Sequence, residues 1–198
     1  MHDSIIIKEN VVNESFVDGL LAQKDFVKAN ALPREDDTEH DDTFSVTNYS
    51  VSVNHRCRII NHPILNDDVI INIFNTANNE YFKLDIDWSN CTPVSYVKKY
   101  TEDDAGFLTW HDDVLPDAHP EFGWRALSMS IILEDQFKGG DIEFKKSWED
   151  EEILNIPRLK KYSAVIFKPQ LPHRVSLVTE GVRTALVTWL WTKENIYT

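Results

Sequence analysis

Residues 164–191 read AVIFKPQLPHRVSLVTEGVRTALVTWLW, and this stretch contains three short apolar segments separated by turn-forming residues. The segments cover residues 164–168, 173–178 and 183–191, and Glu180-Gly181 marks a turn before the last one. Each is rich in the β-branched and aromatic residues that favour strands. A succession of short strands joined by turns predicts a compact β-sandwich or jelly roll.

The same alternation of short apolar segments and turns extends back to about Pro93. Strands are expected at residues 94–100, 107–113, 125–133 and 141–144, with a weak segment near Ile153. Gly139-Gly140 supplies a further turn in this region.

Two helices are expected before this β-rich region. One follows a cap at Asn13 and covers residues 15–27, and the other follows a cap at Asn66 or Asp67 and ends at Asn78-Asn79. The apolar face of the second helix consists of Val69, Ile70, Ile73, Phe74 and Ala77. The remaining elements expected here are strands at 5–7, 44–53 and 81–87 and an acidic, solvated loop at 33–43.

These patterns together predict one α+β, mainly β domain over residues 1–198. Residues 1–92 are expected to form a supporting region of helices and strands, with the helices packed on one face of a sheet. Residues 93–198 are expected to form the jelly-roll core.

Composition excludes several classes of protein. Lys and Arg number 20 against 33 Asp and Glu, a formal net charge of −13, so non-specific binding to nucleic acid or to an anionic membrane is not expected. A local basic pocket for a small anion remains compatible with this surface. No apolar run approaches the ~20 residues of a membrane span, and the first residues lack the pattern of a signal peptide. Cys57 and Cys91 are expected to be reduced thiols of a cytoplasmic protein.

A histidine and a carboxylate two residues apart occur at residues 40–42, 111–113 and 119–121. On a strand such residues project to the same face and can bind one metal ion. Only His111 and Asp113 follow an apolar strand, residues 107–110, that can hold two ligands rigidly. The other two pairs lie in loops, and solvated or hydrogen-bonded side chains are the expected interpretation there.

His173 and Arg183 complete the set of candidate site residues. His173 directly follows the apolar strand 164–168, and Arg183 opens the apolar strand 183–191. An arginine there is costly to bury without an anionic partner, and an ion pair with an acid such as Glu180 is one explanation. The other explanation is a bound anion.

Two histidines and one carboxylate form the facial triad of non-haem iron sites, which leaves three coordination positions open. A small dianion could bind iron through two of these positions, and Arg183 could hold its far carboxylate in a bidentate manner. Dioxygen would take the last position.

In this order His111-x-Asp113, His173 and Arg183 resemble the Fe(II)- and 2-oxoglutarate-dependent dioxygenases, and more narrowly their prolyl 4-hydroxylase-like branch. Three blocks around these residues carry the resemblance: Tyr100…Gly106-Phe107…His111-Asp112-Asp113; Arg125-Ala126-Leu127-Ser128…Leu133 with Phe137-Lys138-Gly139-Gly140-Asp141-Ile142; and Phe167-Lys168-Pro169…Pro172-His173-Arg174-Val175…Gly181-Val182-Arg183…Trp189. The resemblance covers residues 81–191.

The resemblance implies a double-stranded β-helix that binds Fe(II) through His111, Asp113 and His173. It implies 2-oxoglutarate and O2 as co-substrates, with ascorbate as an optional further cofactor. Arg183 would bind the distal carboxylate of 2-oxoglutarate, and Tyr100 would be a second donor to it or else a core aromatic residue.

Three smaller points follow from the same resemblance. Ser128 and Ser130 share one strand face and could line the co-substrate pocket, or they could be small residues that packing requires. Ile132 stands where some relatives have an aromatic hydroxyl, so contacts to the co-substrate are expected to be fewer. Residues 114–124 form either a lid over the metal or an ordinary exposed loop.

The predicted function is therefore hydroxylation of an unactivated C–H bond, with release of succinate and CO2. The preferred substrate is a prolyl residue of a peptide or protein, and the alternative is a free amino acid or another small molecule. Two other classes stay open: a non-catalytic jelly-roll binding module, and a hydrolase in which the same three ligands hold zinc.

Overall fold

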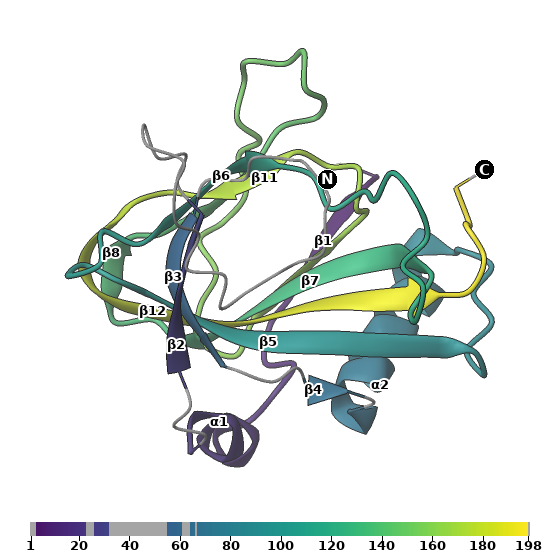
Figure 1. Cartoon of the computed structure of the whole chain (residues 1–198), viewed down its shortest axis with the longest axis horizontal. Helices are drawn as coiled ribbons and strands as arrows, with labels where there is room; N and C mark the ends of the chain where they lie inside the picture. Colours follow the sequence, from purple (N-terminus) through teal and green to yellow (C-terminus); the bar gives the residue numbers. More distant parts are fainter. Residues whose placement is uncertain (1–2, 23–25, 32–54, 61–63, 66, 198) are drawn as a thin grey trace.

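A curled, mostly antiparallel β-sheet dominates the computed structural model of the chain, which describes residues 3–22, 26–31, 55–60, 64–65 and 67–197 (Figure 1). Its strands are β1 (Ile5–Lys8), β2 (Phe26–Ala31), β3 (His55–Ile60), β4 (Ile64–Leu65), β5 (Cys91–Thr101), β6 (Phe107–His111), β7 (Trp124–Glu134), β8 (Phe137–Gly139), β9 (Ile142–Phe144), β10 (Ala164–Phe167), β11 (His173–Val175) and β12 (Val178–Thr192). The helices are α1 (Glu14–Leu21) and α2 (Asp68–Ala77), and α2 continues into a π-helical turn, η1 (Asn78–Phe82).

The strand order is β1-β10-β7-β12-β5-β3-β6-β11-β9, so strands far apart in sequence lie side by side. The long strands β5, β7 and β12 form the centre of one wall, with β12 paired to both of the others. The short strands β6, β11 and β9 form the other end of the path, and Figure 1 shows β6 and β11 apart from the long strands. This arrangement is the jelly-roll double-stranded β-helix that the sequence resemblance implies, so the predicted fold class is confirmed.

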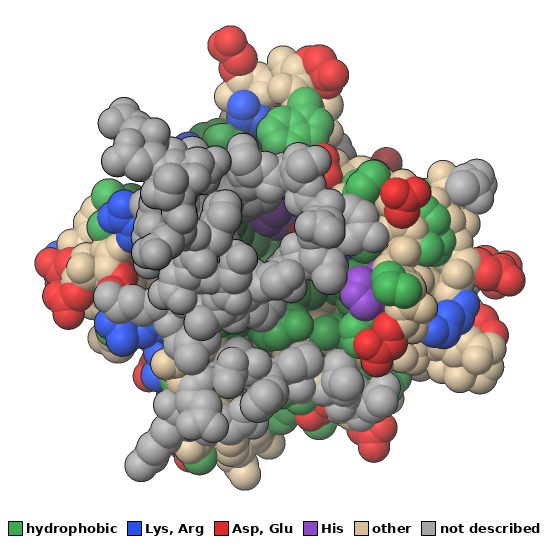
Figure 2. Space-filling view, viewed as in Figure 1, with side chains coloured by type: hydrophobic (Ala, Val, Ile, Leu, Met, Phe, Trp, Pro, Cys, Tyr) green, Lys and Arg blue, Asp and Glu red, His purple; other side chains and the backbone are tan. Residues whose placement is uncertain are grey.

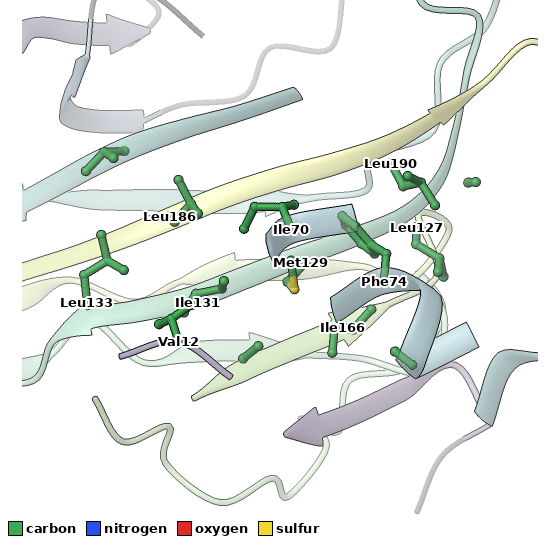
Figure 3. Packing of buried hydrophobic residues seen from close by; sticks show 14 of the residues in the cluster. Val12, Ile70, Phe74, Leu127, Met129, Ile131, Leu133, Ile166, Leu186 and Leu190 are labelled. Carbon is green, nitrogen blue, oxygen red and sulfur yellow. The ribbon is translucent and has the colours of Figure 1, made fainter. Parts of the chain in front are cut away.

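The two helices cover the outer face of the long strands. From Leu127 to Leu133 the side chains of β7 alternate, and the odd-numbered ones join the main core cluster with Phe74 of α2 (Figure 3). Phe74 is completely buried. Ser128, Ser130 and the other even-numbered residues face the interior of the β-helix, which is where the candidate site lies.

Both helix caps form as predicted. The Asn13 side chain accepts a hydrogen bond from the Phe16 amide, and Asp67 caps α2 by accepting from Val69 and Ile70. The first helix nevertheless ends at Leu21, so its predicted extension to Val27 is wrong. Residues 26–31 instead form β2, which pairs with β3 over its whole length, and this pairing outweighs a weak local helical pattern.

The strand predicted at 81–87 is also wrong. Helix α2 runs on into η1, and Lys83 then adopts a left-handed conformation with φ of 56°. The Asn78 side chain holds this turn, because its amide donates to the Leu84 carbonyl and its oxygen accepts from the Leu84 amide, both at 2.9 Å. Because the Asn78 side chain pairs with both the N–H and the C=O of Leu84, this backbone does not need a neighbouring strand to form its hydrogen bonds.

Three further differences concern the β-rich region. No strand forms near Ile153, which is 41% exposed. Glu180-Gly181 is not a hairpin turn, because β12 runs through it; Gly181, with φ of 76°, lies where β12 exchanges β8 for β5 as its partner. The strand β8 is additional to those predicted in this region, as are β2, β3 and β4 in the part of the chain before it.

Strands from both sides of residue 92 share the sheet, since β1 pairs with β10 and β3 with β5 and β6. The single domain with a boundary between residues 92 and 93 stays a prediction. The loop predicted at 33–43 and the strand predicted at 44–53 lie outside the described residues. None of the described helices has the length and apolar character needed to cross a membrane.

Candidate metal centre and co-substrate pocket

His111, Asp113 and His173 come together in the interior of the β-helix. His111 ends β6 and His173 begins β11, and the two residues are direct partners across the antiparallel pair. One ligand atom from each of the three side chains lies within 4.8 Å of the others, and all three residues are buried. Among the residues that the structure describes, this is the one cluster of three or more histidine, cysteine or acidic side chains with such geometry.

The backbone fixes which nitrogen each histidine presents. His111 Nδ1 lies 2.9 Å from the Thr109 carbonyl oxygen, and His173 Nδ1 lies 2.9 Å from the Leu171 carbonyl oxygen. A carbonyl can only accept, so each Nδ1 carries the hydrogen and each Nε2 keeps its lone pair. The Nε2 atoms lie 3.9 Å (His111) and 3.6 Å (His173) from the nearer oxygen of Asp113. Both lone pairs therefore face the carboxylate, as a shared metal ion requires.

Burial keeps both rings neutral. It is the main factor that lowers the pKa of His111 to about 3, and the neighbouring His173 lowers it further. Burial likewise lowers the pKa of His173. A neutral imidazole is the form that binds a metal ion.

Asp113 is held from three directions. Its amide donates to the Pro169 carbonyl at 2.8 Å, and the Ser128 hydroxyl donates to its Oδ2 at 2.7 Å. Arg125 donates to its Oδ1 at 3.3 Å and to its main-chain oxygen at 3.1 Å. Burial alone would raise the pKa of Asp113, but the nearby histidines, Arg125 and Ser128 together hold it well below its usual range. The carboxylate is therefore ionised and oriented.

The Asp112 side chain shows that successive side chains in residues 111–113 point in alternate directions. Its carboxylate accepts a hydrogen bond from Trp148 Nε1 at 2.9 Å, and Trp148 is 51% exposed. Asp112 thus points away from the cluster that contains its two neighbours, as the two-residue spacing predicts.

Arg183 is buried without an anionic partner. It is 1% exposed, and none of its three guanidinium nitrogens has a hydrogen-bond partner among the described residues. Glu180, the acid that the ion-pair explanation names, forms its salt bridge with Lys138. Burial lowers the pKa of the guanidinium. A buried cation of this kind is expected to have a bound anion as its partner.

Tyr100 lies beside Arg183, its cross-strand partner in the β5–β12 pair. The Arg183 guanidinium carbon lies 5.3 Å from the centroid of the Tyr100 ring. Tyr100 is 1% exposed, and burial raises the pKa of its phenol, so the hydroxyl keeps its proton and can donate.

A small cavity joins the metal cluster to Arg183. Its lining includes the three candidate ligands together with Tyr100 and Arg183. The two-histidine, one-carboxylate donor set matches ferrous iron, and the charge of the unpartnered buried arginine matches a dianion such as 2-oxoglutarate. Ser128 and Ser130 also line this cavity, but the Ser128 hydroxyl is already bonded to Asp113.

A larger cavity of about 520 Å³ lies on another side of Arg183. Residues 153–159 form much of its wall, and it contains neither histidine of the cluster. Ile132 lines this larger cavity, not the smaller one. The cavity that contains the metal cluster and the larger cavity beside Ile132 therefore lie on different sides of Arg183.

The other two histidine–carboxylate pairs do not enter this site. His119 Nδ1 accepts hydrogen bonds from the amides of Glu121 and Phe122, and its ring stacks on Phe122 at 4.9 Å. It also contacts Trp191, so it has a structural role in the loop at 114–124. The pair at 40–42 lies outside the described residues.

Two cations near the cluster were not among the residues predicted from sequence. Arg125 contacts Asp113, and Lys98 lines the cavity. A signal for Arg125 exists, because it opens an apolar strand in the same manner as Arg183. Lys98 has no such signal, since a lysine in an alternating strand is ordinarily exposed.

Comparison with known proteins agrees with this geometry. Residues 95–191 match the family described as the 2OG-Fe(II) oxygenase superfamily. Among solved structures, a prolyl-4-hydroxylase from Pseudomonas putida is similar at 13% identity with a TM-score of 0.61, covering 97% of this chain and 94% of that one. No curated protein sequence matches the chain.

Two further structures share the fold. One is a prolyl hydroxylase from Trichoplax adhaerens in complex with a hypoxia-inducible-factor peptide fragment (13% identity, TM-score 0.60, covering 96% of this chain and 84% of that one). The other is SnoK, a non-haem, α-ketoglutarate-dependent carbocyclase from nogalamycin biosynthesis (12% identity, TM-score 0.57, covering 96% and 79%). The family match over residues 95–191 agrees with the resemblance to this superfamily found in the sequence, and the solved structures share the fold.

Proposed function

We propose that this chain, whose residues 95–191 match the 2OG-Fe(II) oxygenase superfamily, is such an oxygenase and hydroxylates an unactivated C–H bond. In the overall reaction, substrate, 2-oxoglutarate and O2 give the hydroxylated substrate, succinate and CO2. The observation that carries the proposal is the convergence of His111, Asp113 and His173 in one cavity with an unpartnered, buried Arg183.

The iron, when bound with 2-oxoglutarate, supplies the oxidising power that places one oxygen atom of O2 in the substrate and the other in succinate. The side chains of the protein bind and orient the reactants. His111 and His173 present neutral Nε2 atoms, and Asp113 presents an ionised carboxylate that Ser128 and Arg125 hold in place. No side chain has to act as a general base.

Arg183 and Tyr100 would orient the co-substrate. Arg183 would offer two parallel N–H donors to the distal carboxylate, and the Tyr100 hydroxyl would be a further donor in the same cavity. Because the cavity is buried, these charge-assisted hydrogen bonds form without competition from water.

The first candidate for the substrate is a prolyl residue of a peptide or protein, and the second is a free amino acid or another small molecule. Structures that share the fold include both a peptide-bound prolyl hydroxylase and a carbocyclase of antibiotic biosynthesis, so the fold is compatible with either. Ascorbate as a further cofactor stays a prediction. A cytoplasmic location is also a proposal, supported by the free thiols of Cys57 and Cys91.

The test is anaerobic addition of Fe(II) and 2-oxoglutarate to the purified protein. A metal-to-ligand charge-transfer band, followed by iron-dependent succinate formation in air, is expected. A binding module would give no succinate, and a zinc hydrolase would contain zinc and give neither signal. His173→Ala should abolish both signals, whereas the matched variant His119→Ala should keep them, because His119 packs on Phe122 and Trp191.

A further inference from the structure

Lys98 is a cation in the metal-site cavity for which the proposed chemistry has no role. It lies on β5 two residues before Tyr100, so both side chains project to the interior face, and both line the cavity. Its Nζ lies 5.9 Å from the centroid of the Trp189 ring, another residue of the lining. Among the described residues, no carboxylate lies within ion-pair distance of Lys98.

Arg125 lies over the same ring of Trp189, with its guanidinium carbon 4.2 Å from the centroid. One terminal nitrogen of Arg125 is bonded to Asp113, but its Nε is buried and has no acceptor in the described part of the chain. The same holds for the indole Nε1 of Trp189. Lys98, Trp189 and Arg125, which we call the Trp189 wall, therefore carry two positive charges and two donors without acceptors.

A count of charges shows that the co-substrate does not account for this wall. Asp113 and the two carboxylates of 2-oxoglutarate carry three negative charges. Ferrous iron and Arg183 carry three positive charges and balance them. Lys98 then remains as a positive charge on the lining of the cavity, and Arg125, which contacts Asp113, adds a second positive charge over the same ring.

The rest of the protein carries an excess of negative charge. The formal net charge of the chain is −13, and Figure 2 shows acidic side chains distributed around the rim of the visible face. Two cations over one indole beside the metal-site cavity of an acidic protein are therefore a local feature, suited to attracting an anion into the site.

We propose that the Trp189 wall binds a carboxylate of the hydroxylated substrate, and that Lys98 is the residue that selects for it. This inference rests on the proposed function and narrows its substrate to molecules with a free carboxylate near the reacting carbon. Two sources of that group exist: a free amino acid or similar small acid, and the C-terminal residue of a peptide. An internal prolyl residue of a protein chain lacks it.

The experiment measures thermal unfolding of the protein loaded with Mn(II) and 2-oxoglutarate. The probes are amino acids and their amides, beginning with L-proline and L-prolinamide. N-acetyl-L-proline and N-acetyl-L-prolinamide form the arm that represents a peptide end. We expect at least one acid to raise the melting temperature while its amide does not, because only the acid brings a negative charge to the Trp189 wall.

Two lysine variants test whether Lys98 is the residue that binds the carboxylate. Lys98→Met should weaken binding of the acid about tenfold or more and leave the affinity for 2-oxoglutarate unchanged. Lys99→Met is the matched control, since Lys99 is the next residue on the same strand, projects to the other face and lies 4.4 Å over the ring of Phe26. It should keep the preference for the acid.

Three results would overturn the proposal: equal stabilisation by acids and amides throughout the panel, an undiminished preference in Lys98→Met, or a loss of 2-oxoglutarate affinity in that variant. The last result would assign Lys98 to the co-substrate. Failure of the proposed function is seen separately, because Mn(II) and 2-oxoglutarate alone would then not stabilise the wild-type protein.

Discussion

Replacing Arg183 by methionine should change stability and 2-oxoglutarate affinity in opposite directions. Methionine keeps an unbranched stem of similar bulk and removes the guanidinium. Without ligand, the three buried nitrogens of Arg183 have no hydrogen-bond partner among the described residues, and each such group costs about 1–3 kcal/mol. The contact with the Tyr100 ring at 5.3 Å offsets about 0.5–2 kcal/mol of this cost. The free energy of unfolding of the unliganded variant should therefore be unchanged or higher.

The affinity for 2-oxoglutarate should fall in the same variant. Loss of one member of a buried charge pair costs about 2–5 kcal/mol. That corresponds to a rise in the dissociation constant of about 30-fold to several thousand-fold. Urea denaturation of the unliganded protein and calorimetric titration of 2-oxoglutarate into the Mn(II)-loaded protein measure the two quantities.

Arg58→Met is the matched control. Arg58 Nε pairs with Asp104 at 2.8 Å, but the Arg58 side chain is 41% exposed, so stability should fall by less than about 1 kcal/mol and 2-oxoglutarate affinity should not change. The reasoning about Arg183 would be refuted by a variant that loses several kcal/mol of stability without ligand and still binds 2-oxoglutarate normally. Arg183 would then belong to a structural ion pair.

Four further predictions concern single substitutions. His111→Ala should abolish the charge-transfer band and keep a folded protein by circular dichroism; a retained band would contradict its role as a ligand. Ser128→Ala removes the hydrogen bond to Asp113 and should weaken Mn(II) binding more than it weakens 2-oxoglutarate binding to the metal-loaded protein, and the reverse order would make Ser128 a co-substrate ligand. Gly140→Ala should destabilise the protein by about 1–3 kcal/mol in urea, because φ is +63° and the added methyl group would lie 2.8 Å from Val178 Cγ2; a neutral result would show that the turn relaxes. Phe74→Ala should cost about 3–5 kcal/mol in the same assay, and a loss below 1 kcal/mol would mean that α2 contributes little to the core.

The positions of the candidate ligands could be predicted from sequence because each depends on local rules. Two residues of a strand that are two apart share a face, and the apolar segment at 107–110 identified which histidine–carboxylate pair stands on a strand. In the structure His111 ends β6, Asp113 follows just past its end, and His173 joins them through a direct cross-strand pairing with His111. That pairing follows from the order of strands in a jelly roll, which the resemblance implied.

The contacts around the ligands could not be predicted in the same way, because they depend on register between strands. Ser128 and Asp113 are fifteen positions apart, and their hydrogen bond exists only because β7 faces the end of β6. The same holds for Lys98, whose direction is set by the pairing of β5 with β12. Local pattern also failed at residues 81–87, where the Asn78 side chain, not hydrophobic alternation, determines the backbone.

The hydrogen bonds from the two histidine Nδ1 atoms to main-chain oxygens have a consequence for the way such a site can change over generations. A carbonyl oxygen is present whatever amino acid occupies positions 109 and 171, so no codon change there deletes the acceptor of His111 or His173. The Asp113 carboxylate, in contrast, is oriented by the side chains of Ser128 and Arg125, which mutation can replace. Substitution of neighbouring side chains would therefore alter how the carboxylate is held, while the acceptors of the two imidazoles would persist.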